Sequence, residues 1–224
     1  MRLRLDLYLT VGAVTLFCCG CFSLEFQTRV NRRGGGTRTV EIVMDQVMAG
    51  MYNRAGGSDR VFNIPGQGLQ VKPEVRLKGS SRTEREDGSL KLLWDYQTNR
   101  VENFSDDDDS VKLQITRSGP WVYYNYTEKI TASGRTEQFN SGQAGYRMRH
   151  SLSLPGQVVN HNADSLLSGI LIWNRPLAQI TSSGLAMMAT SREINQFYLL
   201  GAVSLVFSLG GALAWKKHRA GKVC

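Results

Sequence analysis

The sequence predicts an α+β fold, in which a mainly antiparallel β-sheet domain with one or two short helices is followed by one C-terminal transmembrane helix. Two observations carry this prediction. Between residues 22 and 195, short runs of alternating apolar and polar side chains are separated by Gly, Asn and Asp, which is typical of half-buried strands joined by turns. After them, Phe197–Trp215 runs for 19 residues without a charge. Such a helix is about 28 Å long, which matches the hydrocarbon core of a bilayer.

The N-terminal segment, residues 1–21, has the layout of a secretory signal. A basic start precedes an apolar stretch that ends in Gly20-Cys21. A small residue directly before a cysteine resembles the lipobox of bacterial lipoproteins, so we expect lipidation at Cys21. The lipobox pattern has leucine where this chain has Cys18. An uncleaved N-terminal anchor and ordinary cleavage without a lipid therefore stay open.

The domain at residues 22–195 opens with a predicted hairpin. Apolar and polar residues alternate in Phe22–Val30 and again in Thr37–Met44, on either side of the glycine-rich turn Asn31–Gly36. Asp45 is placed to cap a short helix. Further strands are predicted at Val71–Arg82, Ser89–Thr98, Val111–Arg117, Trp121–Thr131 and Tyr146–Leu154. We expect these strands to pair within one domain.

No pattern in the domain points to catalysis, a metal or a cofactor. The domain's two histidines, His150 and His161, have no cysteine near them, and the run Asp106–Asp109 lacks the ligand spacing of a calcium loop. No nucleophile elbow, phosphate-binding loop or HExxH motif occurs. We therefore expect a protein that is not an enzyme. An enzyme acting on cell-wall or lipid substrates stays an alternative, which a cleft of polar side chains would reveal.

The position of the charges decides how the net charge of +8 is interpreted. The domain holds 21 Lys and Arg against 18 Asp and Glu, a net charge of +3, and most of the remaining positive charge lies in the tail, residues 216–224. Nucleic-acid binding is therefore not expected. Because the basic cluster directly follows the predicted span at 196–215, the positive-inside rule places the tail in the cytoplasm and the domain outside.

Cysteines and glycosylation triplets bear on the compartment. All four cysteines lie outside the domain, at 18, 19, 21 and 224, so the domain depends on its hydrophobic core rather than on disulfides. Asn103 and Asn125 begin N-x-[ST] triplets, which would be glycosylated only in a eukaryotic secretory pathway. The lipobox-like end argues against that pathway.

Three motifs in the last third of the chain carry a resemblance to a known family. They are Leu152–Asn162 (LSLPGQVVNHN), Ile172-Trp173-Asn174 and Leu185–Asn195 (LAMMATSREIN). With the lipobox, the C-terminal span and the basic tail, these motifs resemble the LppM-like bacterial lipoprotein family. The resemblance implies an antiparallel α+β domain with a cavity that accommodates a lipid or glycolipid.

Aromatic residues are the candidates for lining such a cavity. In the strand WVYYNYTEKIT, Tyr124 and Tyr126 point to one face, and Trp173 supplies a large apolar side chain. An aromatic strand face is also the usual composition of a core, so both interpretations stay open at these three positions.

The leading hypothesis is an envelope lipoprotein that is held in the cell membrane by one helix, also lipid-anchored at Cys21, and that binds a lipid or amphiphile outside the cell. The alternative is an accessory or assembly subunit of a larger membrane protein complex. Ser204, Ser208 and Ala212 recur every four residues in the predicted span, and small residues at this spacing allow close packing against a partner helix.

Overall fold

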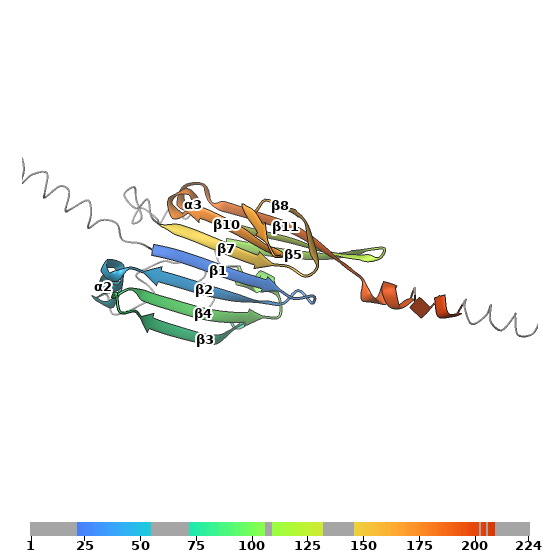
Figure 1. The fold of residues 1–224 in the computed structure, drawn as a ribbon, viewed down its shortest axis with the longest axis horizontal. Coiled ribbons are helices and arrows are strands. Elements are labelled where there is room, and N and C mark those ends of the chain that lie inside the picture. Colours follow the sequence, from blue (N-terminus) through green and yellow to red (C-terminus); the bar gives the residue numbers. More distant parts are fainter. Residues whose placement is uncertain are drawn as a thin grey trace, which may run out of the picture.

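The computed structural model describes residues 22–54, 72–105, 109–131, 146–201, 203–204 and 206–208. These residues form two β-sheets that share one hydrophobic core, together with short helices (Figure 1). The predicted α+β domain with mainly antiparallel strands is confirmed. The predicted lipidation site Cys21, the acidic run Asp106–Asp108 and the basic tail lie outside the described residues.

Sheet A has seven strands in the order β3-β4-β2-β1-β7-β10-β9. Their bounds are β1 Phe22–Val30, β2 Gly36–Met44, β3 Val75–Glu84, β4 Leu90–Thr98, β7 Arg147–Ser153, β9 Ser165–Leu167 and β10 Ile170–Pro176. The predicted hairpin is confirmed, because β1 pairs antiparallel with β2 in full register from Phe22↔Met44 to Val30↔Gly36. On its other side β1 pairs with β7 in parallel, which periodicity along the chain cannot indicate.

Sheet B has four antiparallel strands in the order β5-β6-β11-β8. Their bounds are β5 Asp109–Ser118, β6 Trp121–Ile130, β8 Gln157–His161 and β11 Leu185–Ile194. The β5–β6 hairpin turns at Gly119, whose φ of 57° lies in the left-handed region that glycine tolerates. Since β5 and β6 lie between β4 and β7 in the sequence, the chain leaves sheet A for sheet B and then returns to form the parallel pair.

Two short helices lie next to sheet A. Helix α2, Gln46–Arg54, begins as predicted, because the Asp45 carboxylate accepts a hydrogen bond from the Met48 backbone N–H at 2.9 Å. Helix α3, Leu177–Ser183, directly follows β10 and ends at Gly184, with a φ of 69°. A 3-10 turn spans Val101–Phe104.

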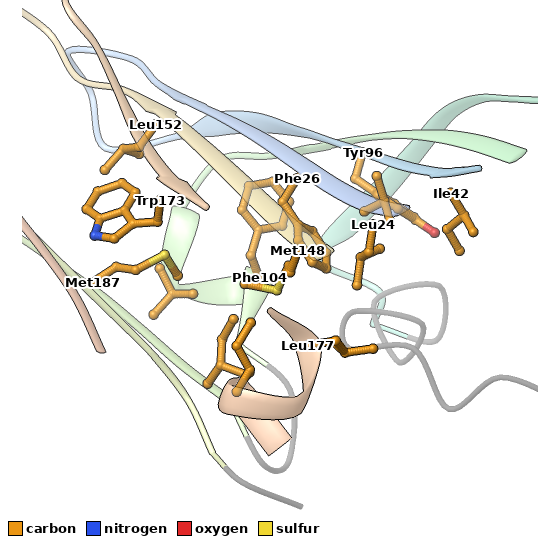
Figure 2. Close-up of a cluster of buried hydrophobic side chains, with 14 of the residues drawn as sticks. Leu24, Phe26, Ile42, Tyr96, Phe104, Met148, Leu152, Trp173, Leu177 and Met187 are labelled. Carbon is orange, nitrogen blue, oxygen red and sulfur yellow. The ribbon is translucent and has the colours of Figure 1, made fainter. Parts of the chain in front are cut away.

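The core lies between the two sheets. Each core strand alternates buried and less buried residues, as in β1, where Leu24 and Phe26 point inward. Figure 2 shows inward-pointing side chains of sheet A, among them Leu24, Phe26 and Trp173, gathered with Met187 of sheet B. The described residues of both sheets thus share one continuous core.

The C-terminal helix leaves from one end of the two-sheet domain, which distinguishes that end from the other. Four turns lie at one end: β1–β2, β5–β6, β7–β8 and β9–β10. In sheet A, Val30 pairs with Gly36, and Ser153 pairs with both Arg29 and Ile170. In sheet B, Trp121 pairs with Ser118 and with Ile194. The C-terminal helix leaves from this end, which we call the helix-proximal end (Figure 1). The first residue of β1 and the β3–β4 turn lie at the opposite end.

Candidate functional site

A buried polar cluster joins the two sheets in the middle of the core. Arg38 on β2 donates from Nη2 to the Glu128 carboxylate on β6 at 2.9 Å and to the Tyr126 hydroxyl at 3.3 Å. Its Nε donates to Thr28 Oγ1 on β1 at 3.0 Å, and the Tyr126 hydroxyl donates to Glu128. The guanidinium also lies over the Phe104 ring, 4.9 Å from its centroid.

His150 on β7 completes the cluster. Its Nε2 lies 3.4 Å from the nearer Glu128 oxygen, and neither ring nitrogen has a hydrogen-bond partner among the described residues. The ring stacks on Phe26 with centroids 5.8 Å apart and meets the edge of Trp173 at 6.1 Å. The imidazole is therefore held by aromatic contacts, beside a carboxylate to which it is not hydrogen-bonded.

Burial and charge set the protonation states of this cluster. Burial lowers the pKa of His150 to about 4, although the Glu128 carboxylate opposes this shift, so the imidazole is neutral at pH 7. Burial opposes ionisation of Glu128 too, but Arg38, His150 and the Tyr126 hydrogen bond outweigh it and lower the pKa of the carboxyl. Burial, followed by the Glu128 charge, raises the pKa of Tyr126 well above its ordinary value. The cluster at neutral pH is thus one ion pair with a neutral tyrosine and a neutral histidine.

The three aromatic side chains predicted to line a cavity are all buried in the domain. Tyr124, Tyr126 and Trp173 are each about 1% exposed. The hydroxyl of Tyr126 is taken up by the buried cluster, and Trp173 Nε1 donates to Asn162 Oδ1 at 3.0 Å. Cavity lining by these residues stays a prediction, since the two surface depressions described below have other linings.

A second Arg–Glu–Tyr set lies at the helix-proximal end. Arg32, in the β1–β2 turn, pairs with Glu193 on β11 at 2.9 Å, and the Tyr124 hydroxyl donates to Glu193 at 2.6 Å. The Arg32 side chain is 62% exposed. Burial and the Glu193 hydrogen bond raise the pKa of Tyr124, so its hydroxyl stays protonated and remains a donor. This set ties the first hairpin to the last strand, two residues before the C-terminal helix.

Two depressions on the described surface bear on ligand binding. The first, of about 300 Å³, lies on the outer face of sheet A and is lined by Gln27, Arg29, Thr37, Thr39, Lys78, Asp95 and Tyr96. The second, of about 620 Å³, lies at the helix-proximal end and is lined by Val30, Asn31, Arg32, Arg33, Ser153, Leu154 and Pro155. The second combines cationic and apolar groups, and its size is in the range of small-molecule sites.

The C-terminal helix begins directly at the end of β11. The Asn195 N–H donates to the Pro120 carbonyl at 2.8 Å, and the Asn195 side-chain oxygen accepts from the Phe197 N–H at 3.1 Å. Asn195 therefore caps the helix and fixes its start to the β5–β6 turn. The large apolar side chains that follow are exposed, with Phe197 at 83% and Phe207 at 77%.

The predicted transmembrane span is described only in part. Among the residues of the structured part of the chain, no helix combines the length and apolarity needed to cross a membrane. The predicted span at 196–215 continues past residue 208, where the description ends, and Ala212 lies in that remainder. Ser208 donates to the Ser204 carbonyl at 2.8 Å, so its hydroxyl already has a partner within its own helix.

Sequence reasoning missed the buried polar cluster, although the signal was present. Arg38 alternates in register with Val40, Ile42 and Met44, which places it on the apolar face of its strand. Glu128 and His150 stand in the same phase as the buried residues of β6 and β7. A charged or imidazole side chain in phase with an apolar face predicts a buried partner of opposite charge. Which residues meet there depends on the sheet packing, which the alternation does not contain.

Comparisons with known proteins leave the family open. No family model matches the chain, and no curated protein matches it. The NMR structure of the folded domain of the Mycobacterium tuberculosis LppM protein is similar, with a TM-score of 0.43 and 12% sequence identity, covering 80% of this chain and 95% of that chain. That domain bears the name of the family that the sequence motifs resemble. A likeness at this score decides neither membership of the family nor function.

Proposed function

We propose that this chain is a membrane-anchored envelope lipoprotein that presents its two-sheet domain on the outer face of the cytoplasmic membrane and binds a lipid or amphiphile there. The observation that carries the proposal is the uncovered apolar helix after Asn195. Phe197, Leu200 and Phe207 are exposed by 83%, 64% and 77%. Burying side chains of this size contributes roughly 1.5–3 kcal/mol each, so a contiguous exposed row of them marks a surface that another apolar phase covers.

The sequence favours a bilayer as that phase. The apolar run continues without a charge to Trp215 and is followed by Lys216 and Lys217, which is the pattern of a membrane span with a cytoplasmic basic flank. Acylation of Cys21 forms part of the proposal, and Cys21 lies directly before β1. A lipid there would attach the domain to the membrane a second time.

The ligand site that the geometry favours is the second depression. It places the guanidinium groups of Arg32 and Arg33 beside the apolar residues Val30, Leu154 and Pro155. This combination suits an amphiphile whose headgroup is anionic or rich in hydroxyl groups. Within the described core, Tyr126 and Trp173 pack against other side chains.

The anchor is tested by washing membranes that contain the full chain at alkaline pH, which removes peripheral proteins. We expect the chain to stay in the membrane fraction. The triple variant Leu200→Lys, Val203→Lys and Phe207→Lys, made in a Cys21→Ser chain that cannot be acylated, is expected to lose membrane retention, because a Lys within a span costs up to about 3 kcal/mol. The matched control, also in the Cys21→Ser chain, is Met51→Lys, Leu77→Lys and Met188→Lys, which changes exposed apolar residues of the domain. Equal retention of the two variants would contradict the anchor.

Ligand binding is tested on the full chain purified in mild detergent. We expect lipid to co-purify, and we expect added short-chain phosphatidylglycerol to raise the melting temperature, since a ligand that binds only the folded state stabilises it. Arg33→Gln is expected to reduce that rise, and Lys112→Gln, on the outer face of sheet B, serves as the matched control. If no lipid co-purifies and no melting temperature changes, the binding proposal is wrong.

A further inference from the structure

We propose that the helix-proximal end of the domain is a membrane-contact surface that binds anionic phospholipid headgroups. The surface consists of the four turns β1–β2, β5–β6, β7–β8 and β9–β10 and the last residues of β11. This inference rests on the proposed helix anchor and adds which part of the domain touches the bilayer and which lipids it prefers.

Only one residue separates the last strand of the domain from the C-terminal helix. Strand β11 ends at Ile194, and helical residues begin at 196. The intervening Asn195 is hydrogen-bonded through its N–H to Pro120 in the β5–β6 turn. A helix that enters the bilayer from this point brings the turn with it. The ion pair between Arg32 and Glu193 ties the β1–β2 turn to the same place, so these turns lie within reach of the headgroups.

The helix-proximal end carries an excess of positive charge. The turns of this end and the last residues of β11 hold four arginines against one glutamate, Glu193, which gives a net charge of +3. The arginines are Arg32, Arg33, Arg117 and Arg192, counted over residues 31–35, 117–121, 154–157, 168–169 and 192–195. The opposite end has no such excess among its described residues, since its β3–β4 turn, residues 84–89, carries three acids against one arginine. Each cation held at an anionic membrane surface contributes to binding. Arg33 and Arg117 are exposed and pair with no carboxylate in the described part of the chain.

Aromatic and exposed apolar side chains also lie at the helix-proximal end. The Arg192 guanidinium lies over the Trp121 ring, 4.7 Å from its centroid. Leu167 and Ile170 flank the β9–β10 turn and are 66% and 41% exposed. Tryptophan beside arginine is typical of the headgroup level of a membrane, and exposed apolar turn residues fit the boundary between headgroups and acyl chains. Charge, aromatic and apolar groups therefore coincide at the end from which the helix leaves.

Hydrogen exchange in lipid nanodiscs tests the contact surface, in a full-length Cys21→Ser chain that is held by its helix alone. One set of discs contains phosphatidylcholine alone, and the other contains phosphatidylcholine with phosphatidylglycerol. We expect the backbone amides of the four turns to exchange about fivefold more slowly in the anionic discs than in the neutral ones. The β3–β4 turn, residues 85–88, is the internal reference and is expected to exchange equally in both.

Charge reversal separates a lipid contact from a general effect of the discs. Arg33→Glu with Arg117→Glu is expected to abolish the difference between the two kinds of disc. The matched pair Arg85→Glu with Lys129→Glu, which changes the net charge equally at the opposite end, is expected to preserve it. Helical content measured by circular dichroism, together with exchange of the core strands, checks that each variant is folded.

The outcomes distinguish this inference from the proposed function. A chain that enters both kinds of disc, but whose four turns exchange equally in both, overturns the contact surface and leaves the anchor intact. A chain that stays out of both kinds of disc overturns the anchor and the contact surface together. Slower exchange in anionic discs that survives Arg33→Glu with Arg117→Glu also overturns the contact surface.

Discussion

Two Arg–Glu–Tyr sets join sheet A to sheet B, and they differ mainly in their access to water. In both sets the arginine comes from the β1–β2 hairpin or its turn, and the ion pair is 2.9 Å long. The side chains of Arg38 and Glu128 are 4% and 3% exposed, whereas those of Arg32 and Glu193 are 62% and 14% exposed. The same chemistry is therefore placed once in the core and once at the helix-proximal end.

This difference in exposure gives the two ion pairs different roles. In the core, removing one partner leaves a charge with no water to solvate it, so the pair fixes how the sheets meet. At the helix-proximal end water and salt reach the Arg32 guanidinium, although Glu193 is largely buried, so the pair is screened and contributes less to stability than the buried pair. Arg32 is consequently free to exchange its carboxylate partner for an anionic headgroup, whereas Arg38 is not.

The largest expected effect comes from breaking the buried pair. Arg38→Met leaves Glu128 buried and unpaired, and we expect a loss of about 3–5 kcal/mol in the free energy of unfolding. Unfolding of the full chain in mild detergent, followed by circular dichroism, measures this loss. In the double variant Arg38→Met with Glu128→Leu no unpaired charge remains, so its loss is expected to be smaller than that of Arg38→Met. A double variant less stable than the single one would contradict this explanation, because it would show that Glu128 stabilises the core even without Arg38.

Acid is expected to destabilise the buried set through His150. Its pKa is lowered to about 4 by burial, so between about pH 6.5 and pH 4 the unfolded chain binds a proton that the folded chain does not. Stability is therefore full above about pH 6.5 and falls by about 3 kcal/mol as the pH drops to 4. The lowered pKa of Glu128 adds a further loss of stability at still lower pH.

The variant His150→Phe tests the source of this acid dependence. It retains an aromatic ring between Phe26 and Trp173 and removes the titrating group, so its stability is expected to change much less between pH 6.5 and pH 4. Melting temperatures measured across that range compare it with the parent chain. An unchanged slope in the variant would assign the acid dependence to other groups.

A smaller effect is expected at the link between β10 and β11. Asn162 accepts from Trp173 Nε1 at 3.0 Å and from the Met188 N–H at 2.8 Å, and it donates to the Ala186 carbonyl at 2.8 Å. Asn162→Ala leaves the buried indole N–H without its partner, and we expect a loss of about 1–3 kcal/mol in unfolding free energy. Asn160→Ala, on the exposed part of β8, is the control and is expected to change stability by less than about 0.5 kcal/mol.

The smallest effect is expected at the exposed pair. Arg32→Gln should lower stability by about 0.2–1 kcal/mol at low salt and by less at high salt, because water and ions screen the pair. Unfolding measured at two salt concentrations checks this expectation. A loss as large as that of Arg38→Met would remove the distinction between the two sets.

The part of the fold that is local in sequence could be predicted, and the part that joins distant segments could not. Alternation located β1, β2, β4 and β6 to within about two residues, and Asp45 was identified as a helix cap. The predicted strand at 71–82 is observed as β3 at Val75–Glu84. The parallel pairing of β1 with β7 depends on contacts across more than a hundred residues, and periodicity carries no information on such pairing.

In the candidate site, too, single residues could be predicted from the sequence, but their long-range contacts could not. The sequence left core and cavity open for Trp173, and the structure places it in the core at 1% exposure. The partners of Tyr126 and Glu128 were not foreseen, because Arg38 reaches both of them, and His150 lies beside Glu128, from strands of the other sheet. The basic charge of the helix-proximal end was also hidden, since its four arginines are spread over three separate segments of the chain.

The two ends of the domain also set the geometry of attachment to a membrane. Cys21 precedes Phe22, at the opposite end from Asn195. A strand of nine residues such as β1 is about 30 Å long. A chain anchored by its helix alone keeps only the helix-proximal end at the membrane, whereas acylation at Cys21 brings both ends to the bilayer and lays the strands along it.

Energy transfer to a headgroup-labelled lipid tests the central claim most directly, in a Cys21→Ser chain that has only the helix anchor. A fluorescent amino acid is placed at Ser118, in the β5–β6 turn, and in a second sample at Glu86, in the β3–β4 turn. Transfer in reconstituted membranes is expected to be strong from position 118 and weak from position 86, because the two turns lie at opposite ends of the strands. Equal transfer from the two positions, or stronger transfer from position 86, would contradict the account.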